Sequence, residues 1–330
     1  MELIVSDGAQ LLRDGRPFRF VLANAYYLAD EVGQGARAHA IEALDAAATL
    51  GLAVVRAWAF NDDPQKTSRM QNGLGDAHEP GMRALDEVVA EAGRRNLRLI
   101  LPLLNYWPAY GGLAQWLAWR GTPVADADRD HPERYAASFY RDTQLRDAYR
   151  HRVEGLLDRR NTVTGARYGD DPTVLAWELM NEPRGAPDDW IAFAAAVVRG
   201  RCRQLVALGD EDARDSPDLD LTSLHFYPEK QSAADDAERF GNAAIQSAAH
   251  RVTHPLIVGE FGLRNDGLPL ATRQSAYRAW FASAVDAGVT GIGPWLLGYA
   301  ARPPAWDEEY TFSVGGDYDA LLRAAVEDFS

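Results

Sequence analysis

Two glutamates stand out because each ends an apolar, strand-like run of the sequence. Glu182 lies in WELMNEPR at 177–184, and Glu260 lies in PLIVGEFG at 255–262. A carboxylate is rarely buried in a hydrophobic strand without a partner or a purpose, because its charged form loses hydration there. Two of them at matching strand ends indicate an acid and base pair. The alternative is that each is one half of a structural salt bridge.

The elements that must position these glutamates follow from the hydrophobic pattern, since short apolar runs alternate with longer amphipathic ones. The apolar runs predict eight strands, at residues 18–27, 53–60, 97–105, 174–181, 204–209, 221–227, 255–261 and 291–297. The amphipathic runs predict helices at residues 36–50, 82–95, 143–160, 190–203, 232–251, 272–287 and 317–328. The fifth crossover is the exception, because the short stretch 210–220 lacks a clear helical pattern.

This alternation predicts an α/β fold, and specifically a (β/α)8 TIM barrel. Strands buried on both faces and joined by helices form parallel sheets with right-handed crossovers, and eight such units close into a barrel. The chain has 330 residues, of which 47% are hydrophobic, and no linker or low-complexity tract divides it. We therefore expect a single domain over residues 1–330. Turn signals at Asp7-Gly8 and Asp14-Gly15 predict an N-terminal hairpin that plugs the bottom of the barrel.

A barrel also predicts where polar side chains should gather, because the carboxyl ends of its strands converge on one mouth. Polar and aromatic residues do collect at the predicted strand ends. They are Asn24, Tyr26, Tyr27, Arg56, Trp58, Asn105, Tyr106, Trp107, Asn181, Glu182, His225, Tyr227, Glu260 and Trp295. We expect these side chains to face a common site.

Composition limits the partners that such a site can have. The formal net charge of −14 and the pI near 4.9 argue against nucleic acid, and no run approaches the roughly 18 apolar residues of a membrane span. The N-terminus lacks the basic start and apolar stretch of a signal peptide. We expect a cytoplasmic protein, or a secreted one if the chain is a processed mature form. Nothing in the sequence indicates an oligomeric state.

Cysteine and histidine usage does not indicate a metal site or a thiol nucleophile. Cys202 lies in a helical pattern, where it is expected to be a small buried hydrophobe. His250 and His254 have the i, i+4 spacing of a zinc pair, but His254 directly precedes Pro255 and no HExxH motif surrounds them. No strand end carries the His-x-His of a metal-dependent barrel. We therefore expect no metal and no organic cofactor.

The motifs themselves resemble those of family 5 glycoside hydrolases, a family of retaining barrel enzymes, and most closely its β-1,4-mannanase branch. The resemblance runs from NAYYL at Asn24 to Trp295, and its most specific stretch is 139–184, where NTVTG precedes YGDDPTVLAWELMNEPR. NEP together with HFY at 225–227 and GEFG at 259–262 makes it specific. It implies an endo-β-1,4-mannanase that cleaves mannan, glucomannan or manno-oligosaccharides by double displacement.

By this resemblance Glu182 is the general acid/base and Glu260 is the nucleophile. The first must hold a proton when it meets the leaving oxygen and the second must be ionised, so their surroundings should differ. Arg56 is expected to hold Glu260 in its charged form, and Tyr227 to donate a hydrogen bond to it. A retaining mechanism predicts that the two carboxyl groups lie about 5 Å apart.

Two further residues take supporting roles by the same resemblance. Asn181 should bind the sugar 2-hydroxyl, and His225 should orient the network by hydrogen bonds. The alternatives are that Arg56 is a structural counter-ion and that His225 and Tyr227 are satisfied core residues.

Sugar binding requires aromatic platforms and polar groups at the rim. The resemblance makes Trp295 the floor under the sugar being cleaved, Trp107 a wall of the non-reducing side and Arg184 a contact on the leaving-group side. Glu211 is then the partner of Arg184, although these two residues also fit a surface ion pair. The other candidates are Asn105 and Trp58. Trp116, Trp119 and Trp306 are weaker candidates, because packing in the core would explain them equally well.

Two departures from the family pattern affect the predicted cleft. The short stretch 210–220 replaces a longer loop and helix, which should open the leaving-group side. Many family members carry a histidine near the end of the third strand, where this chain has Asn105.

Alternatives to the endo-mannanase remain. An exo-acting β-mannosidase would need a loop that blocks one end of the cleft, and residues 65–81 are the candidate. A β-1,4-glucanase ranks third. A non-catalytic sugar-binding barrel is disfavoured while both glutamates are present.

Overall fold

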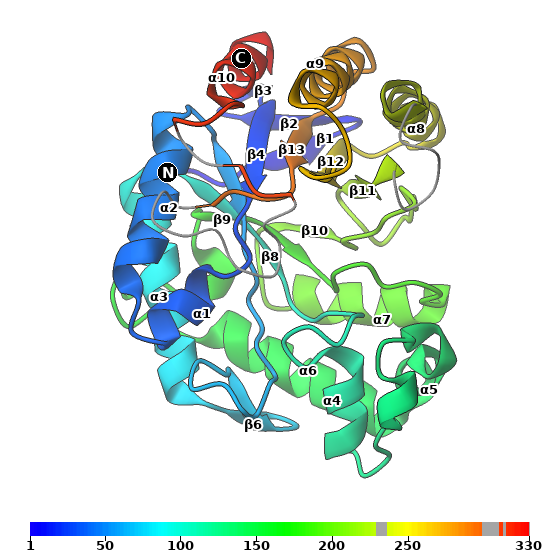
Figure 1. Cartoon of the computed structure of the whole chain (residues 1–330). Helices are drawn as coiled ribbons and strands as arrows, with labels where there is room; N and C mark the ends of the chain where they lie inside the picture. The colour runs from blue at the N-terminus through cyan, green and yellow to red at the C-terminus, as the bar shows by residue number, and fades with distance from the viewer. Residues whose placement is uncertain (229–235, 299–309, 313–314, 330) are drawn as a thin grey trace.

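A closed barrel of eight parallel strands forms the centre of the molecule (Figure 1). The computed structural model describes residues 1–228, 236–298, 310–312 and 315–329. The strands in chain order are β4 (Phe20–Asn24), β5 (Val54–Arg56), β8 (Arg98–Pro102), β9 (Val174–Glu178), β10 (Leu205–Ala207), β11 (Thr222–Phe226), β12 (Leu256–Phe261) and β13 (Gly291–Pro294). Each pairs in parallel with its neighbours, and a parallel bridge between Ala207 and Leu221 joins β10 to the start of β11.

All eight strand predictions and the (β/α)8 fold are confirmed. Every observed strand lies inside its predicted run and is shorter than it. In seven of the eight runs, residues remain at the carboxyl end and enter the loops of the mouth, whereas β12 ends with its run at Phe261. The apolar pattern therefore covered both the strand and the beginning of the loop that follows it.

The predicted helices surround the sheet. They are α2 (Arg37–Thr49), α3 (Glu79–Arg94), α6 (Thr143–Asp158), α7 (Asp188–Arg199), α8 (Ala237–Arg251), α9 (Leu270–Asp286) and α10 (Asp319–Phe329). The start of α6 has a direct cause, because the Asp142 carboxylate accepts hydrogen bonds from the backbone N–H groups of Gln144 and Leu145. Residues 208–221 contain no helix, as expected for the fifth crossover. None of the helices in the described ranges is both long and apolar enough to span a membrane.

Several short elements in the loops were not predicted from the sequence. They are α1 (Leu28–Gly33), the hairpin of β6 (Gln71–Gly73) and β7 (Asp76–Ala77), α4 (Gly112–Trp119), α5 (Ala136–Arg141) and the 3-10 turns η1 (Asp126–Asp128), η2 (Pro132–Arg134) and η3 (Tyr168–Asp170). Elements of this length show too few residues to establish a hydrophobic period.

The N-terminal segment closes the bottom of the barrel, as predicted, but with one strand more than a hairpin. β1 (Val5–Asp7), β2 (Gln10–Arg13) and β3 (Arg16–Pro17) form a three-stranded antiparallel sheet. Side chains from this segment and from the barrel strands form one buried cluster, which includes Ile4, Leu11, Phe18, Leu22, Val54, Ile100, Leu175 and Ile257.

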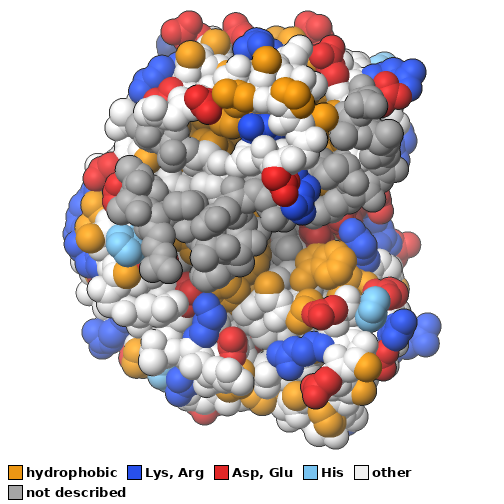
Figure 2. Space-filling view, in the orientation of Figure 1, with side chains coloured by type: hydrophobic (Ala, Val, Ile, Leu, Met, Phe, Trp, Pro, Cys, Tyr) orange, Lys and Arg blue, Asp and Glu red, His pale blue; other side chains and the backbone are white. Residues whose placement is uncertain are grey.

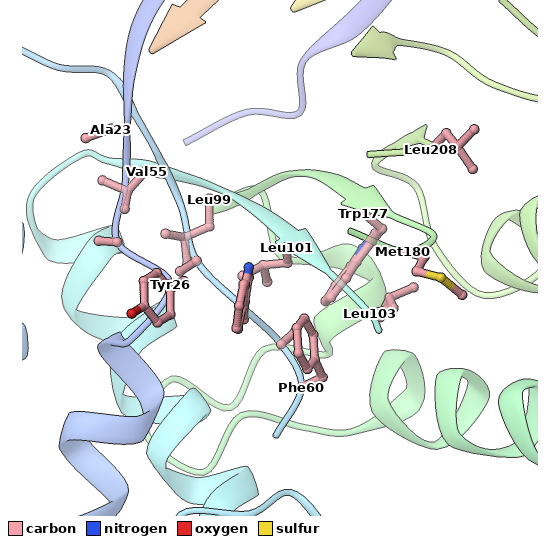
Figure 3. Packing of buried hydrophobic residues seen from close by; sticks show 14 of the residues in the cluster. Ala23, Tyr26, Val55, Phe60, Leu99, Leu101, Leu103, Trp177, Met180 and Leu208 are labelled. Atoms are coloured by element: carbon pink, nitrogen blue, oxygen red, sulfur yellow. The ribbon is translucent and has the colours of Figure 1, made fainter. Parts of the chain in front are cut away.

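A second and larger cluster lies between the sheet and the helices (Figure 3). Val55, Leu99 and Leu101 belong to it, whereas their chain neighbours Val54 and Ile100 belong to the inner cluster. This alternation is what a strand buried on both faces produces. On the surface, basic and acidic side chains are interspersed over the face that Figure 2 shows.

Candidate active site

A pocket of about 1030 Å³ opens at the carboxyl ends of the barrel strands. Most of the side chains predicted to face a common site line it. They are Tyr26, Trp58, Asn105, Trp107, Asn181, Glu182, Tyr227, Glu260 and Trp295, and the predicted substrate-binding residues Arg184 and Glu211 line it too. The structure therefore brings together residues that are spread over more than two hundred positions of the chain.

Glu260 is buried and bound by two donors. Nη1 of Arg56 donates to its Oε1 at 2.6 Å, and the Tyr227 hydroxyl donates to its Oε2 at 2.7 Å. Burial alone would lower the pKa of Arg56, but the negative charges of Glu178 and Glu260 raise it above its ordinary value. Burial and the charge of Glu260 raise the pKa of Tyr227 well above its ordinary value, so its hydroxyl remains a donor. Each oxygen of the Glu260 carboxyl group therefore has its own hydrogen-bond donor.

Glu178 is a third buried carboxylate that the sequence reasoning missed. It is the last residue of β9, and it accepts hydrogen bonds from Nε and Nη2 of Arg56 at 2.9 and 2.7 Å. The same signal that marked Glu182 and Glu260 was present, because Glu178 also interrupts an apolar run. Arg56 is therefore shared between a carboxylate that faces the pocket and one that does not line it.

Two asparagines extend this network. Nη2 of Arg56 donates to Oδ1 of Asn181 at 2.7 Å, and Nδ2 of Asn181 donates to Oδ1 of Asn105 at 3.0 Å. Asn105 is fixed in turn, because its Nδ2 donates to the Ala109 carbonyl at 3.1 Å. Asn105, near the end of the third strand, is thus a fixed member of this hydrogen-bond network.

Glu182 adopts an unusual backbone conformation, with φ of 50°. Positive φ is uncommon for residues other than glycine, and it persists where the surrounding structure holds it. Here the Glu182 N–H donates to the Gly209 carbonyl at 2.8 Å, and the Arg184 N–H donates to the Glu182 carbonyl at 2.7 Å. In its side chain, Oε2 accepts a hydrogen bond from Nε1 of Trp107 at 2.6 Å.

His225 lies between the two glutamates. Its Nδ1 is 3.1 Å from Oε1 of Glu182 and 3.5 Å from Oε1 of Glu260. Burial would lower the pKa of His225, but the charge of Glu260 and the hydrogen bond with Glu182 raise it. A Cβ atom at Gly259 would lie 2.8 Å from Nε2 of this ring, so the glycine of the GEFG motif makes room for the histidine.

The two carboxyl groups lie at a short distance. One oxygen of Glu182, one oxygen of Glu260 and a ring nitrogen of His225 all lie within 4.8 Å of one another. Retaining glycosidases place their carboxyl groups about 5 to 5.5 Å apart, and inverting ones about 6.5 to 9.5 Å apart. This trio is also close enough to bind a cation, but Arg56 already places a positive charge 2.6 Å from Glu260. The geometry therefore matches a pair of carboxyl groups that act directly on a glycosidic bond.

Comparison with known proteins agrees with this geometry. A family model described as GH family 5 beta-mannosidase-like matches residues 1–311. The chain belongs to glycoside hydrolase family 5. Among curated relatives of this hydrolase, mannan endo-1,4-beta-mannosidase 2 of Oryza sativa subsp. japonica is 33% identical over 321 residues, with 82% of this chain and 70% of the relative covered. Mannan endo-1,4-beta-mannosidase 7 of Arabidopsis thaliana is 30% identical, with 87% and 75% covered.

Solved structures of similar proteins share the barrel fold of this family 5 hydrolase. The glycoside hydrolase family 5 mannosidase from Rhizomucor miehei has a TM-score of 0.87 at 22% identity, and the match covers 99% of this chain and 97% of that one. The endo-beta-1,4-mannanase from Thermotoga petrophila has a TM-score of 0.82 at 23% identity, with 96% and 78% covered. The resemblance read from the motifs is confirmed at the level of the family and the fold.

Aromatic rings of this family 5 hydrolase line one side of the pocket. Trp295 stacks on Tyr26 with ring centres 5.2 Å apart and planes 4° apart, and Tyr26 contacts Trp58 at 4.7 Å. Of the three weaker tryptophan candidates, the two that the structure describes, Trp116 and Trp119, do not line the pocket. Trp116 is fully buried and donates to Asp62, so it is a core residue; Trp119 packs against the core outside the pocket; Trp306 lies outside the described residues.

The Arg184–Glu211 ion pair is present, and both of its side chains line the pocket. Nη2 of Arg184 donates to Oε1 of Glu211 at 2.6 Å. Burial raises the pKa of Glu211 in spite of this contact. The Arg184 guanidinium also lies 4.7 Å from the ring centre of Trp107. The sequence placed Trp107 and Arg184 on opposite sides of the cleavage point, whereas in the structure they are in contact.

The rim of the pocket in this hydrolase includes residues that the sequence reasoning did not name as site residues, namely Lys66, Ala109, Tyr110 and Tyr310. Nζ of Lys66 lies 2.6 Å from Oδ2 of Asp30 and 4.0 Å from the ring centre of Tyr110. Most of these residues lie in loops, where no hydrophobic period marks the direction of a side chain.

Cys202 takes no part in the pocket. It is half-buried, and burial raises the pKa of its thiol to about 11, which leaves it a poor nucleophile at neutral pH. This agrees with its predicted packing role, although its burial is partial.

Proposed function

We propose that this family 5 hydrolase is a retaining endo-β-1,4-mannanase, which cleaves β-1,4-mannosidic bonds in mannan, glucomannan or manno-oligosaccharides. The observation that carries this proposal is the pair of buried glutamates, which lie close together and have different partners. Glu260 is bound by a cation and a phenol, whereas Glu182 is bound by an indole and an imidazole. The substrate class follows from the mannanases among the relatives.

In the first step Glu260 attacks the anomeric carbon of the sugar. A bond forms between its carboxylate oxygen and that carbon, and the bond to the leaving oxygen breaks while Glu182 gives the leaving oxygen a proton. Arg56 and Tyr227 keep Glu260 ionised for this attack. Asn181 lines the pocket one residue before the acid, where it binds the sugar 2-hydroxyl.

In the second step Glu182 acts as a base. It takes a proton from a water molecule, whose oxygen attacks the anomeric carbon and displaces the Glu260 carboxylate. Both steps use protein side chains and water, and they require no cofactor. His225 contacts both glutamates and therefore holds their relative position as the proton moves.

The experiment that tests this proposal is a product profile on mannan, mannohexaose, cellohexaose and para-nitrophenyl β-mannoside. We expect mannobiose and longer products early in the digestion of mannohexaose, and little cleavage of cellohexaose. A faster rate on cellohexaose would contradict the substrate assignment. Glu260→Ala is the control, because its rate gives the background hydrolysis that remains when the nucleophile is absent.

A second candidate is an exo-acting β-mannosidase, and one observation favours it. Lys66 comes from the segment 65–81 that the sequence marked as a possible block, and it lines the pocket while bound to the buried Asp30. A wall fixed in this way restricts how far a polysaccharide extends on that side. Mannose as the sole early product from mannohexaose would establish exo action and overturn the endo assignment.

A further inference from the structure

Trp107 links the proposed acid/base to the rim of the pocket. Its indole Nε1 donates to Oε2 of Glu182 at 2.6 Å, and the guanidinium of Arg184 lies 4.7 Å from its ring centre. Arg184 in turn donates to Glu211 from Nε and Nη2. The chain of contacts Glu211–Arg184–Trp107–Glu182 thus crosses three loops, which follow β10, β9 and β8.

The Trp107 ring is held on more than one side. Tyr106 meets it nearly at a right angle, with ring centres 5.3 Å apart, and the Trp107 backbone N–H donates to Oδ1 of Asn105 at 3.2 Å. Arg184 covers a face of the ring, and its own position is fixed by two hydrogen bonds to Glu211. The indole N–H is therefore directed at Glu182 by packing as well as by the hydrogen bond itself.

This contact has a defined chemical consequence. An indole N–H is a donor and never an acceptor, so it stabilises the ionised carboxylate more than the protonated acid. It also restricts rotation of the carboxyl group, because a rotated group would leave a half-buried donor without its acceptor. A proton that Glu182 delivers to the leaving oxygen is thus released more readily and from a fixed direction.

We propose that Trp107 is a positioning residue for Glu182, and that the Arg184–Glu211 pair is the clamp that holds Trp107 in place. The inference rests on the proposed function, because it assigns Glu182 the proton transfer. It gives Trp107 a role that a sugar-binding wall alone would not have.

Other charged and titratable groups also face Glu182. They are His225 on β11, Glu260 on β12, Arg56 on β5, Tyr227 after β11, Arg184 on the same loop and Glu211 after β10. All of them are retained when Trp107 alone is changed to phenylalanine. A change in the pH profile of that variant therefore reports the loss of the indole N–H.

The test compares Trp107→Phe with the unaltered protein on two substrates. The rates are measured from about pH 4 to about pH 10, a range that covers both limbs of a bell-shaped profile. Mannohexaose has a leaving group that needs a proton, whereas 2,4-dinitrophenyl β-mannobioside has one that does not. We expect kcat/KM on mannohexaose to fall about tenfold or more, and kcat/KM on the dinitrophenyl substrate to fall less than about threefold. The alkaline limb on mannohexaose should move up by about one pH unit, because the ionised form of Glu182 loses a donor.

Trp119→Phe is the matched control, since it makes the same substitution in a tryptophan outside the pocket. Its limbs and rates should match those of the unaltered protein. Arg184→Lys loosens the clamp while it keeps the indole N–H and a positive charge near Glu182, so it should move the alkaline limb in the same direction by a smaller amount. The double variant should lose less than the sum of the two single effects, because both act through one contact.

Equal losses on both substrates with an unmoved alkaline limb would overturn the inference and leave Trp107 as a wall of the pocket. If thermal melting shows that Trp107→Phe is not folded, Arg184→Lys carries the same test, and an unmoved limb in that variant overturns the inference. Failure of the unaltered protein to cleave either substrate would instead overturn the proposed function, and this inference with it.

Discussion

Three buried charged side chains at the centre of the barrel mouth lie on barrel strands, whereas charged side chains at the rim of the pocket lie on loops. Arg56, Glu178 and Glu260 belong to β5, β9 and β12, and the exposed fraction of each side chain is 5% or less. At the rim, the side chains of Lys66 and Arg184 are 26% and 51% exposed. Solvent weakens an exposed ion pair but screens a buried one much less. The centre should therefore be rigid and costly to disturb, and the rim should tolerate change.

The largest expected effect is at the centre, in Glu260→Ala. Without the nucleophile, kcat/KM on mannohexaose should fall on the order of 10⁴-fold, and a cooperative melting transition should show that the variant is still folded. Sodium azide, which fits the space of the lost carboxylate, should restore part of the rate and yield an α-mannosyl azide. Activity within tenfold of the unaltered protein would remove Glu260 from the mechanism.

The second-largest effect is expected in Glu178→Gln. This variant tests whether a carboxylate that does not line the pocket still supports the buried charges at its centre. Glu178→Gln leaves the buried Arg56 with a neutral partner, so the free energy of unfolding should fall by on the order of 3 kcal/mol. A displaced Arg56 should also lower kcat/KM roughly 10- to 100-fold. Glu79→Gln is the matched control, because its ion pair with Arg159 is half-exposed and should contribute less than about 1 kcal/mol. Similar denaturant midpoints for the two variants would contradict the contrast between buried and exposed pairs.

At the rim, Lys66→Met should alter the products more than the rate. The rate on para-nitrophenyl β-mannoside should stay within about threefold, but mannohexaose should be cut at different bonds, because one wall of the pocket loses its cation.

The same variant should also be less stable in acid. Burial would raise the pKa of Asp30, but hydrogen bonds from Lys66, Ser68 and Tyr110 outweigh it and lower that pKa. The stability that this lowered pKa provides is present above the ordinary pKa of the group and is lost as pH falls. Acid unfolding of Lys66→Met should therefore begin at a higher pH than that of the unaltered protein. In the digestion of mannohexaose, an unchanged product pattern would show that Lys66 does not shape the cleft.

The smallest effect is expected in the short fifth crossover. Asp215 accepts hydrogen bonds from Thr253 and contacts His254, and these partners lower its pKa to about 2 although burial opposes the shift. Its contribution is present above the ordinary pKa of an aspartate and disappears as pH falls towards 2. Asp215→Asn should therefore reduce stability at pH 7 by about 1 kcal/mol or less, since the group is still 24% exposed and solvent screens its contacts. The difference in melting temperature between the two proteins should vanish near pH 2, and a constant difference would contradict the shift.

The contrast between strand residues at the centre and loop residues at the rim also separates what the sequence predicted from what it did not. Glu182, Glu260, Arg56 and Tyr227 were found because a strand that ends at the barrel mouth limits where its last side chains point. Glu178 carried the same signal and was passed over, because nothing in the sequence distinguishes a carboxylate that lines the pocket from one that lies behind it. For the rim, the sequence marked only the segment 65–81 and did not single out Lys66, since the place of this side chain depends on how the loop folds back over Asp30.

The sequence alone determined the barrel, its eight strands and the pair of glutamates at its mouth, because these follow from hydrophobic periods and from the cost of burying charge. Only the tertiary structure decided which side chains touch across the pocket. The sharing of Arg56 between Glu178 and Glu260, and the contact of Trp107 with both Arg184 and Glu182, join residues from separate loops and strands. Such contacts depend on distances of a few ångströms between segments far apart in the chain, and no local pattern specifies those distances.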